Sequence, residues 1–223
     1  GTRRVSALVA CTGAGWFAPG GGPPAFFSPE HTFDNPYPAG GPVLLFTGAM
    51  DYWPNVDAVV WFVNEIWPSL CQGRPQLRFY IVGRNPPPAV QALAASTVVV
   101  TGTVPDVRPY LQHAAVVVAP LRVARGIQNK ILEAMAMSRP VAAAQSCVAA
   151  IDARAGHELL AAESVADYVD VVTRLLEDSP RADSIGAAGR QRVLASYSWA
   201  AHLSRIDRYL PALAQNPSNK VAP

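Results

Sequence analysis

Residues 115–144 read AVVVAPLRVARGIQNKILEAMAMSRPVAAA. The apolar run at 115–121 predicts a buried strand, a helical pattern follows from Gly126, and the apolar run at 140–144 predicts a second strand. A strand, a helix and a strand in this order form a parallel βαβ unit. The stretch therefore predicts an α/β fold that is built on a parallel sheet.

The same alternation continues on both sides of this unit. Apolar runs predict four further strands, and the first three of them end in glycine: 43–48, 77–83, 97–102 and 158–162. Helical patterns are found at 54–70, 88–95, 104–114, 164–178, 180–197 and 199–214. We expect a doubly wound, mostly parallel, Rossmann-like sheet with helices on both faces, which binds its ligand at the carboxyl ends of the strands.

The ends of the chain differ from its middle in composition. Residues 1–42 are rich in glycine and proline, which predicts an irregular, partly disordered arm that aromatic residues such as Tyr37 pin to the domain. We expect one ligand-binding domain at 43–212 and a frayed tail at 213–223.

The composition excludes several classes of protein. The net charge of +2 comes with no basic stripe, which argues against a nucleic-acid partner. The three cysteines, Cys11, Cys71 and Cys147, are widely spaced and odd in number, and no histidine has the spacing of a metal ligand, so we expect neither disulfides nor a metal site. The longest apolar runs are too short to span a bilayer. These features favour a cytoplasmic protein.

The spacing at the start of the helix within 115–144 suggests a binding site. Gly126, Lys130 and Glu133 are spaced i, i+4 and i+7, which would place them on one helix face. Free amides near Gly126, Ile127 and Gln128 would bind an anion, and the Lys130 ammonium would add a full charge. The Glu133 carboxylate could accept hydrogen bonds from two neighbouring hydroxyls, as on a ribose. The pattern suits a nucleoside diphosphate, although on spacing alone an exposed Lys130–Glu133 ion pair is the favoured alternative.

Four stretches together resemble a known family. They are FTGAMDYWPNVDAVVWFVNEIWP, VTGTVPDVRPYLQHAAVVVAPLR, GIQNKILEAMAMSRPVAA and AGRQRVLASYSW, which lie in this order within about residues 26–212. The chain resembles the C-terminal half of family 4 (group 1) glycosyltransferases, which have the two-domain B-type fold. The closest likeness is to bacterial sugar transferases associated with exosortase/PEP-CTERM exopolysaccharide loci. The resemblance implies sugar transfer from a nucleotide-sugar donor with retained anomeric configuration and without a bound metal.

The resemblance also implies roles for individual residues around the predicted helix. Glu133 matches the glutamate that binds the ribose hydroxyls of the donor. Lys130 and the amides of Gly126 and Ile127 match the helix start that faces the diphosphate. These groups would offset the negative charge that develops on the leaving diphosphate.

Further site residues are expected after the strands. Gly48 matches a glycine whose backbone approaches the donor, and Val104 stands where backbone contacts usually hold the base. Arg84 is a further phosphate-binding candidate, although a solvated loop arginine is the favoured interpretation of this residue.

The chain departs from the family pattern at several positions. Arg125 stands where a sugar-facing glutamate is usual, so we count it as a catalytic candidate that could bind diphosphate or an acidic sugar. Ser138 replaces the usual glycine after the helix, and we expect a distorted turn there.

Asn55 is placed to cap the helix at 54–70.

The resemblance sets the expected partners. No cofactor is expected to be bound permanently, and a UDP- or GDP-sugar would be the donor substrate. An N-terminal acceptor domain would be expected before residue 26, and without it the chain should be largely inactive. A homodimer is possible, and the full enzyme could associate peripherally with the inner face of the membrane.

Two other functions are alternatives to sugar transfer. Arg125 and the unusual arm could mark a non-catalytic nucleotide-binding or interaction module with the same fold. A dinucleotide-dependent oxidoreductase is disfavoured, because the first strand is not followed by GxGxxG and the second is not followed by an acid for the ribose.

Overall fold

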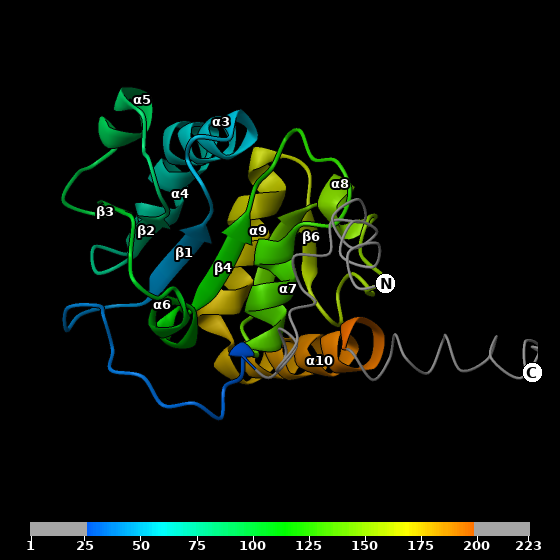
Figure 1. Cartoon of the computed structure of the whole chain (residues 1–223). Coiled ribbons are helices and arrows are strands. Elements are labelled where there is room, and N and C mark those ends of the chain that lie inside the picture. Colours follow the sequence, from blue (N-terminus) through cyan, green and yellow to red (C-terminus); the bar gives the residue numbers. More distant parts are fainter. Residues whose placement is uncertain (1–25, 199–223) are drawn as a thin grey trace, which may run out of the picture.

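The computed structural model of the chain describes residues 26–198 and contains one six-stranded sheet (Figure 1). Every neighbouring pair of strands is parallel, and the strand order is β3-β2-β1-β4-β5-β6. The strands are β1 (Val43–Thr47), β2 (Arg78–Val82), β3 (Val98–Gly102), β4 (Val116–Ala119), β5 (Val141–Ala144) and β6 (Leu160–Ala162). This confirms the predicted doubly wound α/β class, and the order reverses between β1 and β4.

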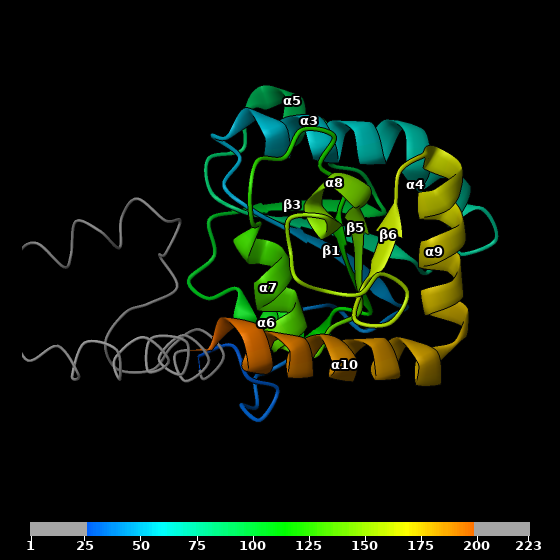
Figure 2. The same cartoon turned by 90° about the vertical axis from the view of Figure 1, so that its right-hand side faces the viewer.

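Helices cover both faces of this sheet (Figure 2). They are α3 (Trp53–Trp61), η1 (Phe62–Ile66), α4 (Trp67–Cys71), α5 (Pro88–Gln91), α6 (Arg108–His113), α7 (Asn129–Ala136), α8 (Gln145–Val148), α9 (Val165–Glu177) and α10 (Ser179–Tyr197). Figure 2 shows α3 and α4 on one side of the sheet and α6, α7 and α10 on the other. Because both faces are covered, the strands are mostly apolar, and Leu44, Leu45 and Phe46 of β1 are completely buried.

The helix predicted at 54–70 contains a π-helical turn. In this segment, η1, the Trp67 amide donates to the Phe62 carbonyl five residues earlier. Pro68 follows Trp67 directly. A proline has no amide hydrogen to donate to the carbonyl four residues before it, and its ring clashes with that carbonyl in a regular α-helix. The wider turn also lets Phe62 and Trp67 pack on Phe79 of β2, with ring centroids at 4.8 and 5.6 Å.

The turn after α7 is regular, so the expected distortion at Ser138 is wrong. Ser138 has a φ of 56°, in the left-handed region, and the two closing hydrogen bonds of a Schellman motif form. The Ser138 amide donates to the Met135 carbonyl at 2.9 Å, and the Arg139 amide donates to the Ala134 carbonyl at 2.9 Å. The serine therefore takes the conformation that glycine takes at lower energetic cost.

Ser138→Gly is expected to raise the free energy of unfolding by about 0.5–1 kcal/mol. Releasing a side chain from the left-handed region gains roughly 1–2 kcal/mol, and the extra freedom of glycine in the unfolded chain offsets part of this gain. Urea unfolding would measure the change. Ser138→Ala keeps the Cβ atom and is the matched control; equal stability of the two variants would contradict the argument.

The described part of the predicted arm packs along the domain. Residues 26–42 contain no strand, and the Tyr37 hydroxyl donates to the Tyr110 carbonyl at 2.7 Å. Burial raises the pKa of Tyr37 above its ordinary value, since the ring is enclosed beside Tyr80 and Tyr110. The predictions for residues 1–25 and for the final helix and tail at 199–223 lie outside the described residues. The domain limits stay a prediction.

Candidate functional site

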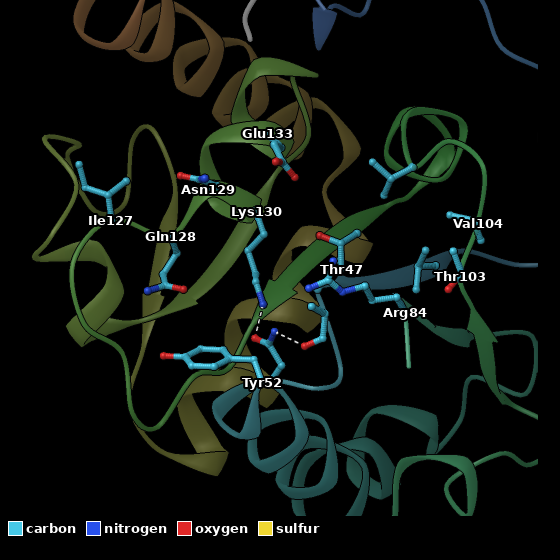
Figure 3. Close-up of a pocket in the computed structure, with 16 residues that line it drawn as sticks. Thr47, Tyr52, Arg84, Thr103, Val104, Ile127, Gln128, Asn129, Lys130 and Glu133 are labelled. Carbon is cyan, nitrogen blue, oxygen red and sulfur yellow. Dashed lines mark hydrogen bonds between the residues drawn. The ribbon is translucent and has the colours of Figure 1, made fainter. Parts of the chain in front are cut away.

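A pocket of about 630 Å³ opens at the carboxyl ends of β1, β2 and β3, where the strand order reverses. The loops after these strands form one side of the pocket, and the start of α7 forms the other (Figure 3). Six of the eight predicted site residues line it: Gly48, Arg84, Val104, Ile127, Lys130 and Glu133. The structure therefore brings together residues that lie as far as 85 positions apart in the sequence.

Two glycines let the ends of β1 and β2 meet. A Cβ atom on Gly83 would lie 1.7 Å from the Gly48 carbonyl oxygen, so no side chain fits there. The Gly48 amide donates to the Val82 carbonyl at 3.0 Å, and the Gly83 amide donates to the Gly102 carbonyl at 3.2 Å. Where these glycines meet, the pocket consequently presents backbone, which allows a ligand to approach closely.

Lys130 reaches from α7 to the base of the pocket. Its Nζ atom donates to Asn55 Oδ1 at 2.5 Å and lies 4.1 Å from the centroid of the Phe46 ring. A Cβ atom on Gly48 would lie 2.8 Å from this Nζ, so the glycine leaves room for the ammonium. Burial lowers the pKa of Lys130 to about 7, although Cys147 and Glu133 favour the charged form.

Asn55 does not cap its helix, so that prediction is wrong. The N-cap of α3 is Tyr52, and Asn55 lies inside the first turn with 5% of its surface exposed. Its Nδ2 donates to the Ala49 carbonyl at 2.8 Å, while its Oδ1 accepts from Lys130. Sequence reasoning missed this contact because the two residues are 75 positions apart.

Glu133 lies one turn after Lys130 on the same side of α7 and is half-buried. Burial raises the pKa of Glu133 to about 7, and the nearby Lys130 opposes this shift. The alternative of an exposed Lys130–Glu133 ion pair is wrong, because both side chains are half-buried and the ammonium bonds to Asn55 instead. Glu133 thus presents its carboxyl to the pocket without an ion pair among the described residues.

Helix α7 begins later than the spacing argument assumed. Gln128 is its N-cap, and Gly126 lies in the preceding loop with a φ of 65°. Gly126 therefore does not share a helix face with Lys130 and Glu133, and that expectation is wrong. The free amides at the helix start belong to its first turn, from Asn129 onward.

The remaining candidates occupy the rim of the pocket or lie beyond it. Figure 3 shows Ile127 and Val104 at opposite ends, with Lys130 and Glu133 between them. Arg84 lines the pocket, is exposed, and has its Nε 3.3 Å from Asp51 Oδ2. The exposed Arg125 and Gly126 are not among the lining residues.

Thr47 supplies a polar group that sequence reasoning missed. The residue ends β1, lines the pocket and is 5% exposed. Within residues 26–198, its hydroxyl is the only buried side-chain nitrogen or oxygen without a hydrogen-bond partner. An unsatisfied buried hydroxyl is uncommon, so it marks a point where the site can still gain a partner.

Residues 26–198 show neither a metal-binding cluster nor a helix that could span a membrane. No cluster of three or more histidine, cysteine, aspartate or glutamate residues has the arrangement of a metal site. No helix in this part of the chain has the length and apolar character needed to cross a membrane.

The sequence model of the family described as "Glycosyl transferases group 1" matches residues 41–178, which span β1 to the end of α9. The chain belongs to this family. The pocket at the strand ends is therefore the pocket of a glycosyltransferase domain. A comparison with curated proteins finds no match.

Solved structures confirm that the fold is that of half a B-type glycosyltransferase. A glycosyltransferase from Rickettsia africae has a TM-score of 0.69 at 16% identity, over 86% of this chain and 55% of that one. HepE from Anabaena, solved with UDP and glucose, has a TM-score of 0.57 at 17% identity, over 78% of this chain and 49% of that one. The chain thus spans about half the length of these two proteins.

A third structure is a domain of similar extent. It is the C-terminal domain of LpcC, a group 1 family glycosyltransferase from Francisella tularensis, with a TM-score of 0.60 at 17% identity. The match covers 72% of this chain and 88% of that one.

Proposed function

We propose that the pocket binds the nucleoside diphosphate of a nucleotide-sugar donor, and that the chain is the donor-binding half of a retaining glycosyltransferase. The observation that carries this proposal is the placement of Lys130 and Glu133 at the strand-order reversal. An ammonium at the start of a helix and a carboxyl one turn later match the diphosphate and the ribose of one ligand.

The lining residues suggest how the donor lies. The diphosphate would contact Lys130 and the first amides of α7, opposite the backbone of Gly48. The ribose hydroxyls would donate to Glu133, and the base would lie toward Val104. Arg84 would reach the phosphates only by leaving Asp51, because the two side chains form an ion pair.

The chemistry of transfer follows from this placement. As the bond between the sugar and the diphosphate breaks, negative charge grows on the leaving oxygen. A protonated Lys130 and the positive end of the α7 dipole would stabilise this charge more than they stabilise the bound donor. Their contribution would therefore lower the barrier rather than merely tighten binding.

The class of donor can be narrowed by comparison. HepE was solved with UDP and glucose, and the pneumococcal O-GlcNAc transferase GtfA was solved with UDP and GlcNAc. By analogy, we propose a UDP-sugar, with a GDP-sugar as the alternative. A thermal-shift panel of UDP, GDP and their sugar conjugates would test this choice, because a ligand stabilises the fold in proportion to its occupancy.

The role in the cell is also a proposal. We place the full enzyme in bacterial exopolysaccharide synthesis, in the cytoplasm or at the inner face of the membrane. The resemblance to transferases of exosortase-associated loci supports this placement. Sugar transfer would require an N-terminal acceptor domain that closes the other side of the cleft, and the exposed domain alone could form a homodimer.

A non-catalytic nucleotide-binding module is the second candidate, and the position of Arg125 favours it. The residue that stands where the family has a sugar-facing glutamate does not line the pocket. Adding the natural N-terminal half and measuring sugar transfer separates the two functions. Restored transfer supports the enzyme, whereas intact nucleotide binding without transfer supports the module.

Glu133→Ala is expected to weaken UDP binding about 10- to 100-fold, the usual cost of losing hydrogen bonds to a charged group. Calorimetry above pH 7 should be used, because the raised pKa leaves the carboxyl largely protonated below about 7. The wild-type protein should prefer UDP to its deoxyribose analogue, and the variant should lose this preference.

The matched control for this experiment is Glu65→Ala, which removes an exposed carboxylate from η1. It should leave UDP affinity and the ribose preference unchanged. Unchanged UDP affinity in Glu133→Ala would show that the ribose assignment is wrong.

A further inference from the structure

The Lys130 ammonium is enclosed by groups of three kinds. Asn55 Oδ1 accepts its hydrogen bond at 2.5 Å, the Phe46 ring lies 4.1 Å away at its centroid, and the backbone of Gly48 leaves the space that it fills. None of these groups carries a charge. The ammonium is thus oriented by contacts that do not neutralise it.

Asn55 must donate one hydrogen bond and accept another in a buried place, and few side chains can do both. It is buried at 5% exposure between a carbonyl acceptor and an ammonium donor. Its amide donates to the Ala49 carbonyl with one end and accepts from Lys130 with the other. An aspartate would place a second oxygen against the Ala49 carbonyl, and an aliphatic residue would leave both partners unpaired.

We propose that Asn55 is a positioning residue of the donor site: its neutral amide holds the Lys130 ammonium at the base of the pocket and leaves the neutralisation of its charge to the bound diphosphate. The inference rests on the proposed function and assigns a role to a residue that does not itself need to touch the donor. We also infer that binding of the diphosphate is coupled to the uptake of a proton by Lys130.

The surroundings of Lys130 support this link. The titratable groups that act on it are Cys147 of α8 and Glu133 of its own helix, and both favour the ammonium. Burial outweighs them and lowers the pKa of Lys130 to about 7. A diphosphate within contact distance would raise this pKa again, because an opposite charge nearby favours the ammonium.

Proton uptake can be measured on the unmodified chain. Calorimetric titration with UDP at about pH 8, in two buffers with different heats of ionisation, should show net uptake of roughly half a proton or more per site. Lys130→Arg keeps the charge and cannot lose its proton, so its uptake should fall to near zero. Binding of UDP without uptake by the wild-type chain would overturn the link.

The positioning role can be tested with isotope-labelled lysine and nuclear magnetic resonance. The chain has only two lysines, Lys130 and Lys220, so Lys130→Arg assigns the signals by removing one of them. Asn55→Asp should raise the midpoint of the Lys130 titration by about one unit or more, and Asn55→Ala should lower it. Both should weaken UDP binding roughly tenfold at pH 7.5, the first by competing with the diphosphate and the second by releasing the lysine.

Asn64→Asp is the matched control, because it makes the same change at an exposed asparagine of η1. It should leave the Lys130 midpoint and the UDP affinity where they are. A folded Asn55 variant with the wild-type Lys130 midpoint would overturn the positioning role and leave the proposed function intact. Failure of the wild-type chain to bind any nucleotide from pH 6 to 9 would instead overturn the proposed function, and this inference with it.

Discussion

Gly83→Ala is expected to destabilise the fold by about 4 kcal/mol or more, a large part of the roughly 5–15 kcal/mol that separates folded from unfolded domains. The added Cβ atom would meet the Gly48 carbonyl oxygen at 1.7 Å. That oxygen belongs to the end of β1, and the Gly48 amide bonds to Val82 beside the substitution. Relief therefore requires β1 and β2 to separate at the base of the pocket.

Urea unfolding would measure this loss of stability. If the variant folds too poorly for that, the fraction of soluble, folded protein would measure it instead. Gly73→Ala is the matched control. Gly73 has a left-handed φ of 76° but nothing within 4 Å of an added Cβ atom, so its replacement should cost only about 1–2 kcal/mol of backbone strain. Similar losses for the two variants would mean that the Gly48–Gly83 contact is not the cause.

Lys130→Met is expected to lower UDP affinity about 100-fold at pH 7 without lowering the free energy of unfolding. The methionine keeps the length of the side chain and its packing on Phe46, but it removes the charge that a diphosphate would contact. It also removes the cost of burying an ammonium, which offsets the loss of a donor to Asn55. Calorimetry with UDP and urea unfolding of the same samples would test both parts.

The dependence of stability on pH gives a second check on Lys130. The pKa of Glu133 is raised from 4.5 to about 7 on folding, so the native state holds more protons than the unfolded state between these values, and its stability falls as pH rises. The pKa of Lys130 is lowered from 10.5 to about 7, so the unfolded state holds more protons between those values, and stability rises with pH.

These two opposite slopes predict that Glu133 and Lys130 together stabilise the fold least near pH 7. Lys130→Met should remove the rise on the alkaline side and keep the fall on the acid side. Lys130→Arg is the comparison that keeps a charge in the same place. An unchanged alkaline slope in Lys130→Met would show that another group is responsible for it.

Most of the fold could be predicted from local patterns. Buried parallel strands are recognisable as short apolar runs, and all six runs correspond to strands of the sheet. Glycines at the ends of three runs marked the edge where a ligand would bind. The π-helical turn was missed because Phe62–Ile66 continues the apolar helical pattern, and only Pro68 marks the interruption.

The site was predictable in part, and the reason lies in sequence distance. Lys130 and Glu133 are neighbours on one helix, so their spacing already suggested a diphosphate and a ribose. The contact of Asn55 with Lys130 depends on how two separate helices meet, and a helix cap was the nearer explanation. The start of α7 was placed too early because Gly126 fitted the helical period, although its left-handed φ of 65° places it in the loop before the Gln128 N-cap.

The contact between Gly48 and Gly83 has a consequence for attempts to alter this pocket. At this contact there is no side chain to exchange, and the backbone tolerates none, so the surface presented by these two glycines would stay the same in any redesigned variant. Changes of ligand preference would have to come from lining positions away from this contact, such as Arg84, Val104 and Ile127. A mutant library confined to those three positions would therefore sample new selectivities while leaving the chain able to fold.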